Sequence, residues 1–210
     1  MQRILFICPQ PFFQWRGSPI RVRFVLQALS ELGYEVDLLT LPFGEDVDLP
    51  NVRIIRVPNL FRVSNVAIGP SLVKALFDLV IIYRARQLLK ESNYDVIHGI
   101  EEGGFIAQLL SRIYDSKAVF EKHSDPFSHR KGFLRNLVLS LYASMEKYTV
   151  RRTGLVIGTG PGLADQARRM GPKGEVAAIF DIPSSLVEAT PEQAAAQAAT
   201  LRESDGEMLI

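Results

Sequence analysis

The sequence predicts an α/β fold in which helices wind doubly around a parallel sheet. Two observations predict it: short apolar runs typical of buried strands recur along the chain, and amphipathic helical segments separate most of them. Strands joined through helices lie parallel with right-handed crossovers, so helices are expected on both faces of the sheet. In an open sheet of this kind, ligands bind beyond the carboxyl ends of the strands. The loops that follow the strands are therefore the first place to look for a site.

The chain opens with a strand, a loop and a helix. Residues 4–8 are apolar on both faces and too few for a helix, and Pro9 and Pro11 end the run. A helical stripe of apolar side chains follows and stops before Gly33. The loop over residues 14–19 therefore lies where the carboxyl end of a strand meets the amino end of a helix, a position that favours anions such as phosphate. We expect this loop to touch a substrate.

Six further strands and five further helices are expected after this unit. Short apolar runs that end at prolines, glycines or polar turns mark the strands, and longer segments with helical spacing mark the helices. The predicted strands are 35–41, 53–57, 95–100, 118–122, 155–158 and 175–180, and the predicted helices are about 72–90, 105–114, 133–151, 163–171 and 190–203.

The composition is that of an ordinary globular protein. Of the 210 residues, 47% are apolar and 22% are charged, which argues against disorder. The only cysteine is Cys8, so no disulfide can form within the chain. The amino end lacks the apolar run of a signal peptide, and no run approaches the roughly 20 residues of a membrane span. We expect a cytoplasmic protein.

The net charge of +1 conceals an uneven distribution. Residues 60–90 contain five Lys and Arg against one Asp, and residues 129–152 contain six against one Glu. These basic and apolar segments suit docking on an anionic membrane face, with the protein peripheral on the inner face of the membrane. Core helices with solvated charged edges explain them equally. Nucleic acid is not expected, because no recognised reading motif is present. Within 72–90, one expected face is apolar: Leu72, Leu76, Leu79 and Tyr83.

Five segments in order resemble a known family. They read CPQPFFQWRGSP, ALSELGYEVDLLT, YDVIHGIEEGG, VFEKHSDP and RRTGLVIGTGPGLADQARRMG. This set, within residues 3–185, is similar to the amino-terminal half of family 4 glycosyltransferases of the GT-B fold. The resemblance implies that 1–185 form a Rossmann-like, acceptor-side domain. It also implies an enzyme that moves a sugar from a sugar nucleotide to a saccharide or lipid-linked acceptor, with no metal and no cofactor.

The resemblance assigns substrate-binding residues to the opening loop. Gly17 matches the family's glycine-rich loop, where the backbone approaches the donor phosphate or the transferred sugar. Ser18 stands where the family often has a second glycine. Arg16 and Arg21 offer positive charge beside it. Trp15 could stack on a sugar or a lipid chain, or it could cover the edge of the sheet.

Further site residues follow the fourth and fifth predicted strands. His123 matches the family's histidine that faces the transferred sugar, and its imidazole could exchange hydrogen bonds with a sugar hydroxyl. The alternative is that His123 bonds its local turn with Ser124 and Asp125, of which Asp125 is also a candidate for substrate binding. Glu101 and Glu102 could hold acceptor hydroxyls, or they could simply begin the next helix, where acids favour the helix dipole.

The donor half of such an enzyme is not evident in these residues. Its signature would be two glutamates eight positions apart, and no pair in the chain has this spacing. We expect residues 186–210 to form a linker helix and the first strand of a second domain. The chain alone is then expected to be inactive, because the group that stabilises the departing diphosphate is missing. A separate donor-binding chain could supply it.

Two other functions stay open. One is a non-catalytic acceptor-binding subunit of a split glycosyltransferase. The other is an NAD(P)-binding oxidoreductase, because GTGPG at 158–162 follows a strand and Asp181 lies about 20 residues further on. However, Leu163 occupies the place of the last expected glycine. The three histidines lack the close spacing of a metal site, so no metal is expected.

Overall fold

The computed structural model describes residues 2–64, 66, 71–125, 133–180 and 192. Its centre is one sheet of seven parallel strands in the order β3-β2-β1-β4-β5-β6-β7. Each of the seven strands predicted between residues 4 and 180 is present, and the predicted doubly wound α/β fold is confirmed. The strands are β1 (Arg3–Cys8), β2 (Glu35–Thr40), β3 (Val52–Arg56), β4 (Val96–Ile100), β5 (Lys117–Lys122), β6 (Leu155–Gly158) and β7 (Glu175–Ala178).

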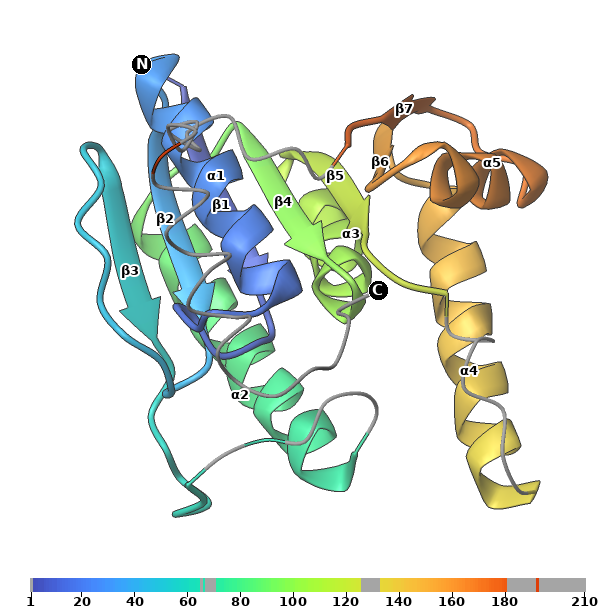
Figure 1. The fold of residues 1–210 in the computed structure, drawn as a ribbon, viewed down its shortest axis with the longest axis horizontal. Helices are drawn as coiled ribbons and strands as arrows, with labels where there is room; N and C mark the ends of the chain where they lie inside the picture. Colours follow the sequence, from blue (N-terminus) through green and yellow to red (C-terminus); the bar gives the residue numbers. More distant parts are fainter. Residues whose placement is uncertain (1, 65, 67–70, 126–132, 181–191, 193–210) are drawn as a thin grey trace.

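The helices lie on both faces of the sheet (Figure 1). Helix α1 packs on one face through Val22 and Leu26, which contact Phe6 and neighbouring strand residues. Helices α2 and α3 cover the other face, and α4 packs against α3. The helices are α1 (Gly17–Glu31), α2 (Leu72–Glu91), α3 (Glu102–Tyr114), α4 (Phe133–Val150) and α5 (Pro161–Arg169). The predicted helix and strand at the end of the chain lie outside the described residues, apart from Glu192.

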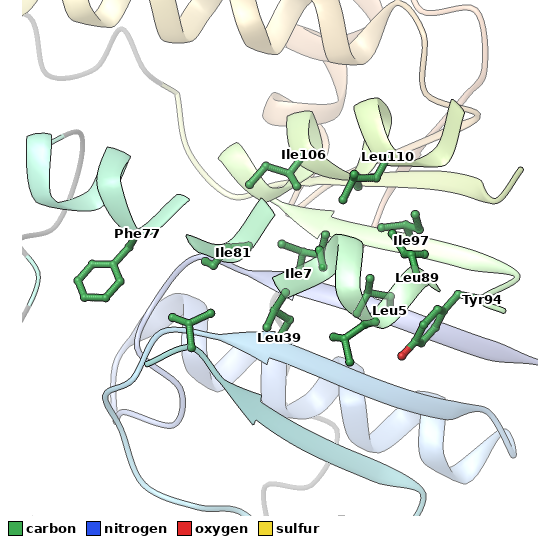
Figure 2. Packing of buried hydrophobic residues seen from close by; sticks show 14 of the residues in the cluster. Leu5, Ile7, Leu39, Phe77, Ile81, Leu89, Tyr94, Ile97, Ile106 and Leu110 are labelled. Carbon is green, nitrogen blue, oxygen red and sulfur yellow. The ribbon is translucent and has the colours of Figure 1, made fainter. Parts of the chain in front are cut away.

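Alternating strand residues divide between two cores, because successive side chains of a strand point to opposite faces. Figure 2 shows the core beneath α2 and α3, where Leu5, Ile7 and Ile97 meet Ile81 and Ile106 from the helices. Each of these side chains is at most 3% or so exposed, a burial that stabilises the fold by roughly 1.5–3 kcal/mol per side chain.

The apolar stripe expected on α2 does not face the core. Leu76, Leu79 and Tyr83 of the expected apolar stripe are exposed. Because α2 is apolar on nearly every side, its spacing alone could not tell the buried face from the exposed one. The side chains that enter the core are Phe77, Ile81, Ala85, Leu88 and Leu89.

The opening loop ends earlier than predicted. Helix α1 begins at Gly17, so the loop spans residues 9–16 and not as far as Pro19. A proline is tolerated in the first turn of a helix, since its missing N–H would have no partner there.

The strand order reverses between β1 and β4. These two strands are neighbours, and the chain leaves β1 toward β2 but leaves β4 toward β5. Ligands bind at such a switch point because the two connections diverge and open a crevice beyond the carboxyl ends of the strands. The loop 9–16, Glu101 and His123 all follow strands at this edge.

Candidate functional site at the switch point

Two glycines set the start of α3 close to the sheet. A Cβ on Gly103 would lie 2.6 Å from the carbonyl oxygen of Ile7, and one on Gly104 would lie 2.1 Å from Cδ2 of Phe120. No larger residue fits there without displacing its neighbours. Glu101, just before the helix, adopts a φ of 49°, which is unusual for a residue other than glycine. Its carboxylate is thereby held at the switch point.

Glu121 is the centre of the site and was missed by the sequence reasoning. Its side chain is 1% exposed and lies at the end of β5. Its Oε1 accepts from Nε of Arg21 at 2.5 Å and from Nε2 of His123 at 3.1 Å. Its Oε2 accepts from Nε2 of His98 at 2.9 Å. We call Arg21, His98, Glu121 and His123 the carboxylate cluster.

The carboxylate cluster keeps Glu121 ionised. Burial alone would raise the pKa of Glu121, but the hydrogen bonds from His123 and His98, together with their charges, hold it well below its usual range. A carboxylate only accepts hydrogen bonds, so each imidazole presents its Nε2 proton to Glu121. Glu121 therefore fixes the orientation of both rings. The ring of His98 is also stacked on Phe6, with 4.3 Å between the ring centroids.

His123 joins the carboxylate cluster to the start of α1 and to α3. Its Nδ1 lies 3.0 Å from Oγ of Ser18, and in the neutral ring Nδ1 accepts from that hydroxyl. Its backbone N–H donates to Oε1 of Glu101 at 3.0 Å. The predicted alternative partners, Ser124 and Asp125, are not the groups bonded to the ring nitrogens. Four predicted site residues, Ser18, Arg21, Glu101 and His123, are thus brought together.

The other predicted residues of the opening loop lie beside this group. Arg16 precedes the helix and gives it no side-chain cap. Gly17 is exposed, and a Cβ there would meet nothing within 4 Å. Arg21 is buried against Glu121, so its charge supports the carboxylate cluster and is not presented to solvent.

Glu102 lies on the opposite face of the sheet. It pairs with Lys74 of α2, and close by Lys122 pairs with Glu146 of α4. Glu101, Glu102, Tyr142 and Glu146 line a cavity between α3, α4 and β5. Burial raises the pKa of Glu101 and of Glu146, and in each case nearby positive charge offsets only part of the effect. Because Glu102 pairs with Lys74 on this face, it lies outside the carboxylate cluster.

Asp125 also lies outside the carboxylate cluster. Its carboxylate accepts a hydrogen bond from the side chain of Gln166 at 3.2 Å.

The glycine turn at 158–162 lies away from the switch point. It joins β6 to α5, and β5 separates β6 from β4. A dinucleotide fingerprint is expected at the switch point, where the pyrophosphate meets the first helix. The position of this turn therefore gives no support to a nicotinamide site, and Asp181 lies outside the described residues.

Metal and thiol chemistry find no support in the part of the chain that the structure describes. No group of three or more His, Cys, Asp or Glu among those residues could hold a metal ion. Burial raises the pKa of the Cys8 thiol to about 12, so the thiol stays protonated and is a poor nucleophile at neutral pH.

A comparison with protein-family models finds a match to Glycosyltransferase Family 4 over residues 15–180. The chain belongs to this family. The matched region of the family 4 domain runs from Trp15 to Phe180, so it contains the whole carboxylate cluster. A comparison with curated proteins finds no match.

Solved glycosyltransferases share the fold of this family 4 domain. Sucrose-phosphate synthase from Thermosynechococcus elongatus matches in two structures, both at 20% identity. The first has a TM-score of 0.62 and covers 96% of this chain and 98% of that chain. The second has a TM-score of 0.61, and the match covers 86% of this chain and 48% of the synthase chain. HepE from Anabaena, in complex with UDP and glucose, matches at 15% identity with a TM-score of 0.59, over 96% of this chain and 50% of HepE.

These identities show the fold of the family 4 domain and no more. The predicted Rossmann-like fold of a GT-B glycosyltransferase is confirmed. The chain spans about half the length of the second synthase structure and of HepE. The substrate contacts of Arg16, Gly17, Ser18, Arg21, Glu101, Glu102, His123 and Asp125 stay predictions.

Proposed function

We propose that this family 4 domain forms the acceptor side of an enzyme that transfers a sugar from a sugar nucleotide to a saccharide or lipid-linked acceptor. The carboxylate cluster at the switch point is the observation that carries the proposal. It holds His123 and Ser18 in a fixed, hydrogen-bonded geometry at the edge where α/β sheets bind ligands. HepE, which has the same fold, is in complex with UDP and glucose, which supports a sugar nucleotide as the donor.

His123 is proposed to contact the sugar, with Glu121 behind it as a positioning residue. Both ring nitrogens are already bonded within the protein, Nε2 to Glu121 and Nδ1 to the Ser18 hydroxyl. A sugar hydroxyl can replace that of Ser18 at Nδ1, since both groups donate and accept. The backbone N–H groups of Gly17 and Ser18, which receive no side-chain cap from Arg16, can then bind a phosphate or a further hydroxyl. No step of this arrangement calls for a metal or a cofactor.

The donor nucleotide is proposed to bind to a second domain or to a separate chain. The family 4 domain covers about half of the second sucrose-phosphate synthase structure and of HepE, and it lacks a pair of glutamates with the spacing expected of a donor site. Stabilisation of the departing diphosphate is usually a dominant catalytic effect. The 210-residue chain is therefore proposed to bind an acceptor without turning over a donor. A non-catalytic acceptor-binding subunit would behave in the same way.

Saturation-transfer NMR on the 210-residue chain tests this proposal. Neutral saccharides such as maltose, sucrose and galactose are the probes, and at least one is expected to bind. His123→Ala is expected to weaken that binding at least fivefold, because a hydrogen bond to the sugar is lost. Asp165→Asn, on the exposed surface of α5, is the matched control and should leave binding unchanged.

Two results would contradict the proposal. One is that no saccharide binds, or that His123→Ala binds as well as the original chain while keeping its circular dichroism spectrum. The other is rapid turnover of UDP-glucose by the 210-residue chain alone. A rise in the fluorescence of a reduced nicotinamide cofactor on addition of the chain would favour the oxidoreductase instead.

The exposed face of α2 suits an anionic membrane surface, and we propose that it docks there. Leu76, Leu79 and Tyr83 are exposed on one side of this helix, and Arg86 and Lys90 are exposed further along it. Apolar side chains beside basic ones bind the interface of a bilayer that contains anionic lipids. None of the described helices is long and apolar enough to cross a membrane. Docking through α2 would bring a lipid-linked acceptor to the protein.

A further inference from the structure

Trp15 presents a bare aromatic surface at the edge of the site. It is the only tryptophan in the chain and lies in the loop directly before α1. The side chain is 73% exposed, so it does not cover the edge of the sheet. Phe12 and Phe13 do so instead, since they are at most 3% exposed and pack with the strands beneath α1. The exposure of Trp15 therefore has no explanation in the packing of the described residues.

The indole of Trp15 rests on an ordered base. The ring of Phe13 meets it edge to face, with 5.0 Å between the centroids and 79° between the planes. Phe13 is itself fixed by two backbone hydrogen bonds with Glu45, each of 2.9 Å. The backbone N–H of Arg16 donates to the carbonyl of Gln14 at 2.8 Å, which closes a turn around Trp15. An aromatic ring held in this way loses little further freedom when a ligand packs on it.

Polar groups of the site lie close to Trp15 along the chain. Ser18 is three residues further on, and its hydroxyl is 3.0 Å from His123. The backbone N–H groups of Gly17 and Ser18 follow Trp15 directly and receive no side-chain cap from Arg16. The residues next to Trp15 in the sequence, Gln14 and Arg16, are polar and partly exposed. Both carry further hydrogen-bonding groups.

We propose that Trp15 is the stacking platform for a sugar ring of the saccharide acceptor. A pyranose has an apolar face of C–H groups and a rim of hydroxyls, so it matches a flat aromatic ring beside hydrogen-bonding groups. The inference rests on the proposed function, which places a saccharide at this edge. It adds a specific contact between the indole of Trp15 and the acceptor. The acceptor must then contain a sugar ring that can lie flat on the indole.

Tryptophan fluorescence tests the proposal directly, because all the tryptophan emission of this chain comes from Trp15. The 210-residue chain is titrated with maltose, sucrose and galactose, and separately with UDP. At least one saccharide is expected to change the emission in a saturable way, whereas UDP should leave it unchanged. Trp15→Ala is then expected to weaken saccharide binding about tenfold in saturation-transfer NMR. Trp15→Phe, which keeps an aromatic ring, should lose less.

Leu32→Ala is the matched control, since Leu32 is also an exposed apolar residue, at 74%, but lies at the carboxyl end of α1. It should bind saccharide as the original chain does. Suppose that a saccharide binds, that it does not change the emission of the original chain, and that Trp15→Ala binds it as tightly as the original chain does. The stacking platform is then wrong and the proposed function stands. If no saccharide binds, both are wrong. If UDP alone shifts the emission, the ring holds a nucleobase and not a sugar. Circular dichroism of Trp15→Ala and Trp15→Phe shows whether each variant is folded.

Discussion

At the scale of single residues, one carboxylate organises the candidate site. Glu121 receives hydrogen bonds from Arg21 of α1, His98 of β4 and His123, although it is almost wholly buried. Removing one partner from such a buried group leaves the others with unpaired charge or unsatisfied hydrogen bonds. Glu121 is thus needed both for the stability of the switch-point edge and for the orientation of His123.

Glu121→Gln is expected to lower the free energy of unfolding by about 3–5 kcal/mol at pH 7, because it removes the buried carboxylate that pairs with Arg21. The folded pKa of Glu121 lies below its unfolded value, so the stability that it adds is present above the unfolded pKa of about 4.3 and is lost as pH falls through the folded pKa. The difference between the variant and the original chain should therefore shrink in acid.

Urea unfolding at pH 7 and at about pH 3, inside the range where the stability is lost, measures this effect. Glu175→Gln, an exposed glutamate on β7, is the control and should change stability by less than about 0.5 kcal/mol. Equal stability of Glu121→Gln and the original chain at pH 7 would show that the carboxylate cluster is not an ionic unit.

At the scale of elements, α2 combines two roles. Its inner face fills the core under β1, β2 and β4, where Phe77 and Ile81 are fully buried. Its outer face carries Leu79 and Tyr83, which are 62% and 65% exposed. A solvated helix face usually carries polar residues, so this outer stripe is the basis of the proposal that α2 docks on a membrane.

Co-sedimentation with vesicles of phosphatidylserine and phosphatidylcholine tests the outer face of α2. The chain is expected to bind at low salt and to be released as salt rises, because basic side chains contribute part of the attraction. Leu79→Glu should weaken binding at least tenfold, since it removes an apolar contact and adds repulsion. Ile113→Glu, on the exposed side of α3, is the control with matched exposure and should bind normally. Failure of the original chain to co-sediment would remove the membrane proposal.

At the scale of the whole molecule, ionisable groups lie on both faces of the sheet at one edge. The carboxylate cluster is beneath α1, and the pairs Lys74–Glu102 and Lys122–Glu146 are on the face covered by α2, α3 and α4. Asp78 of α2 adds a further carboxyl to the second group, and its Oδ1 has no hydrogen-bond partner among the described residues. Burial and the charge of Glu102 raise the pKa of Asp78 to about 7, although Lys74 opposes them.

Asp78→Asn is expected to stabilise the protein, and to do so more at pH 8 than at pH 5. The folded pKa of Asp78 lies above the unfolded value, so ionisation disfavours the folded state as pH rises toward 7. Asparagine stays neutral throughout, and the additional gain at pH 8 should be on the order of 1–2 kcal/mol. Thermal or urea unfolding at both pH values measures it. Asp48→Asn, an exposed loop position, should show no such dependence. A gain that does not change with pH would mean that Asp78 titrates normally.

The sequence by itself determined the elements and their class. The strands are short apolar runs closed by proline, glycine or polar turns, and the helices have helical spacing, so each depends on residues within a few positions of one another. That local information sufficed for a parallel sheet with helices between its strands. It also placed His123, Ser18 and Glu101 at one edge, because the carboxyl ends of parallel strands share that edge.

Only the tertiary structure decided which side chains meet there. Arg21 and Glu121 are 100 positions apart and Ser18 and His123 are 105 apart, so no local pattern could pair them. The sequence suggested that Arg21 presents its positive charge to a substrate, whereas the fold buries its side chain against Glu121. The sequence left open whether Trp15 covers the edge of the sheet or binds a ligand. In the structure Trp15 is exposed, and its neighbours Phe12 and Phe13 cover the sheet instead. Burial sets which charges are paired and which surfaces stay bare, and burial arises only when distant segments pack together.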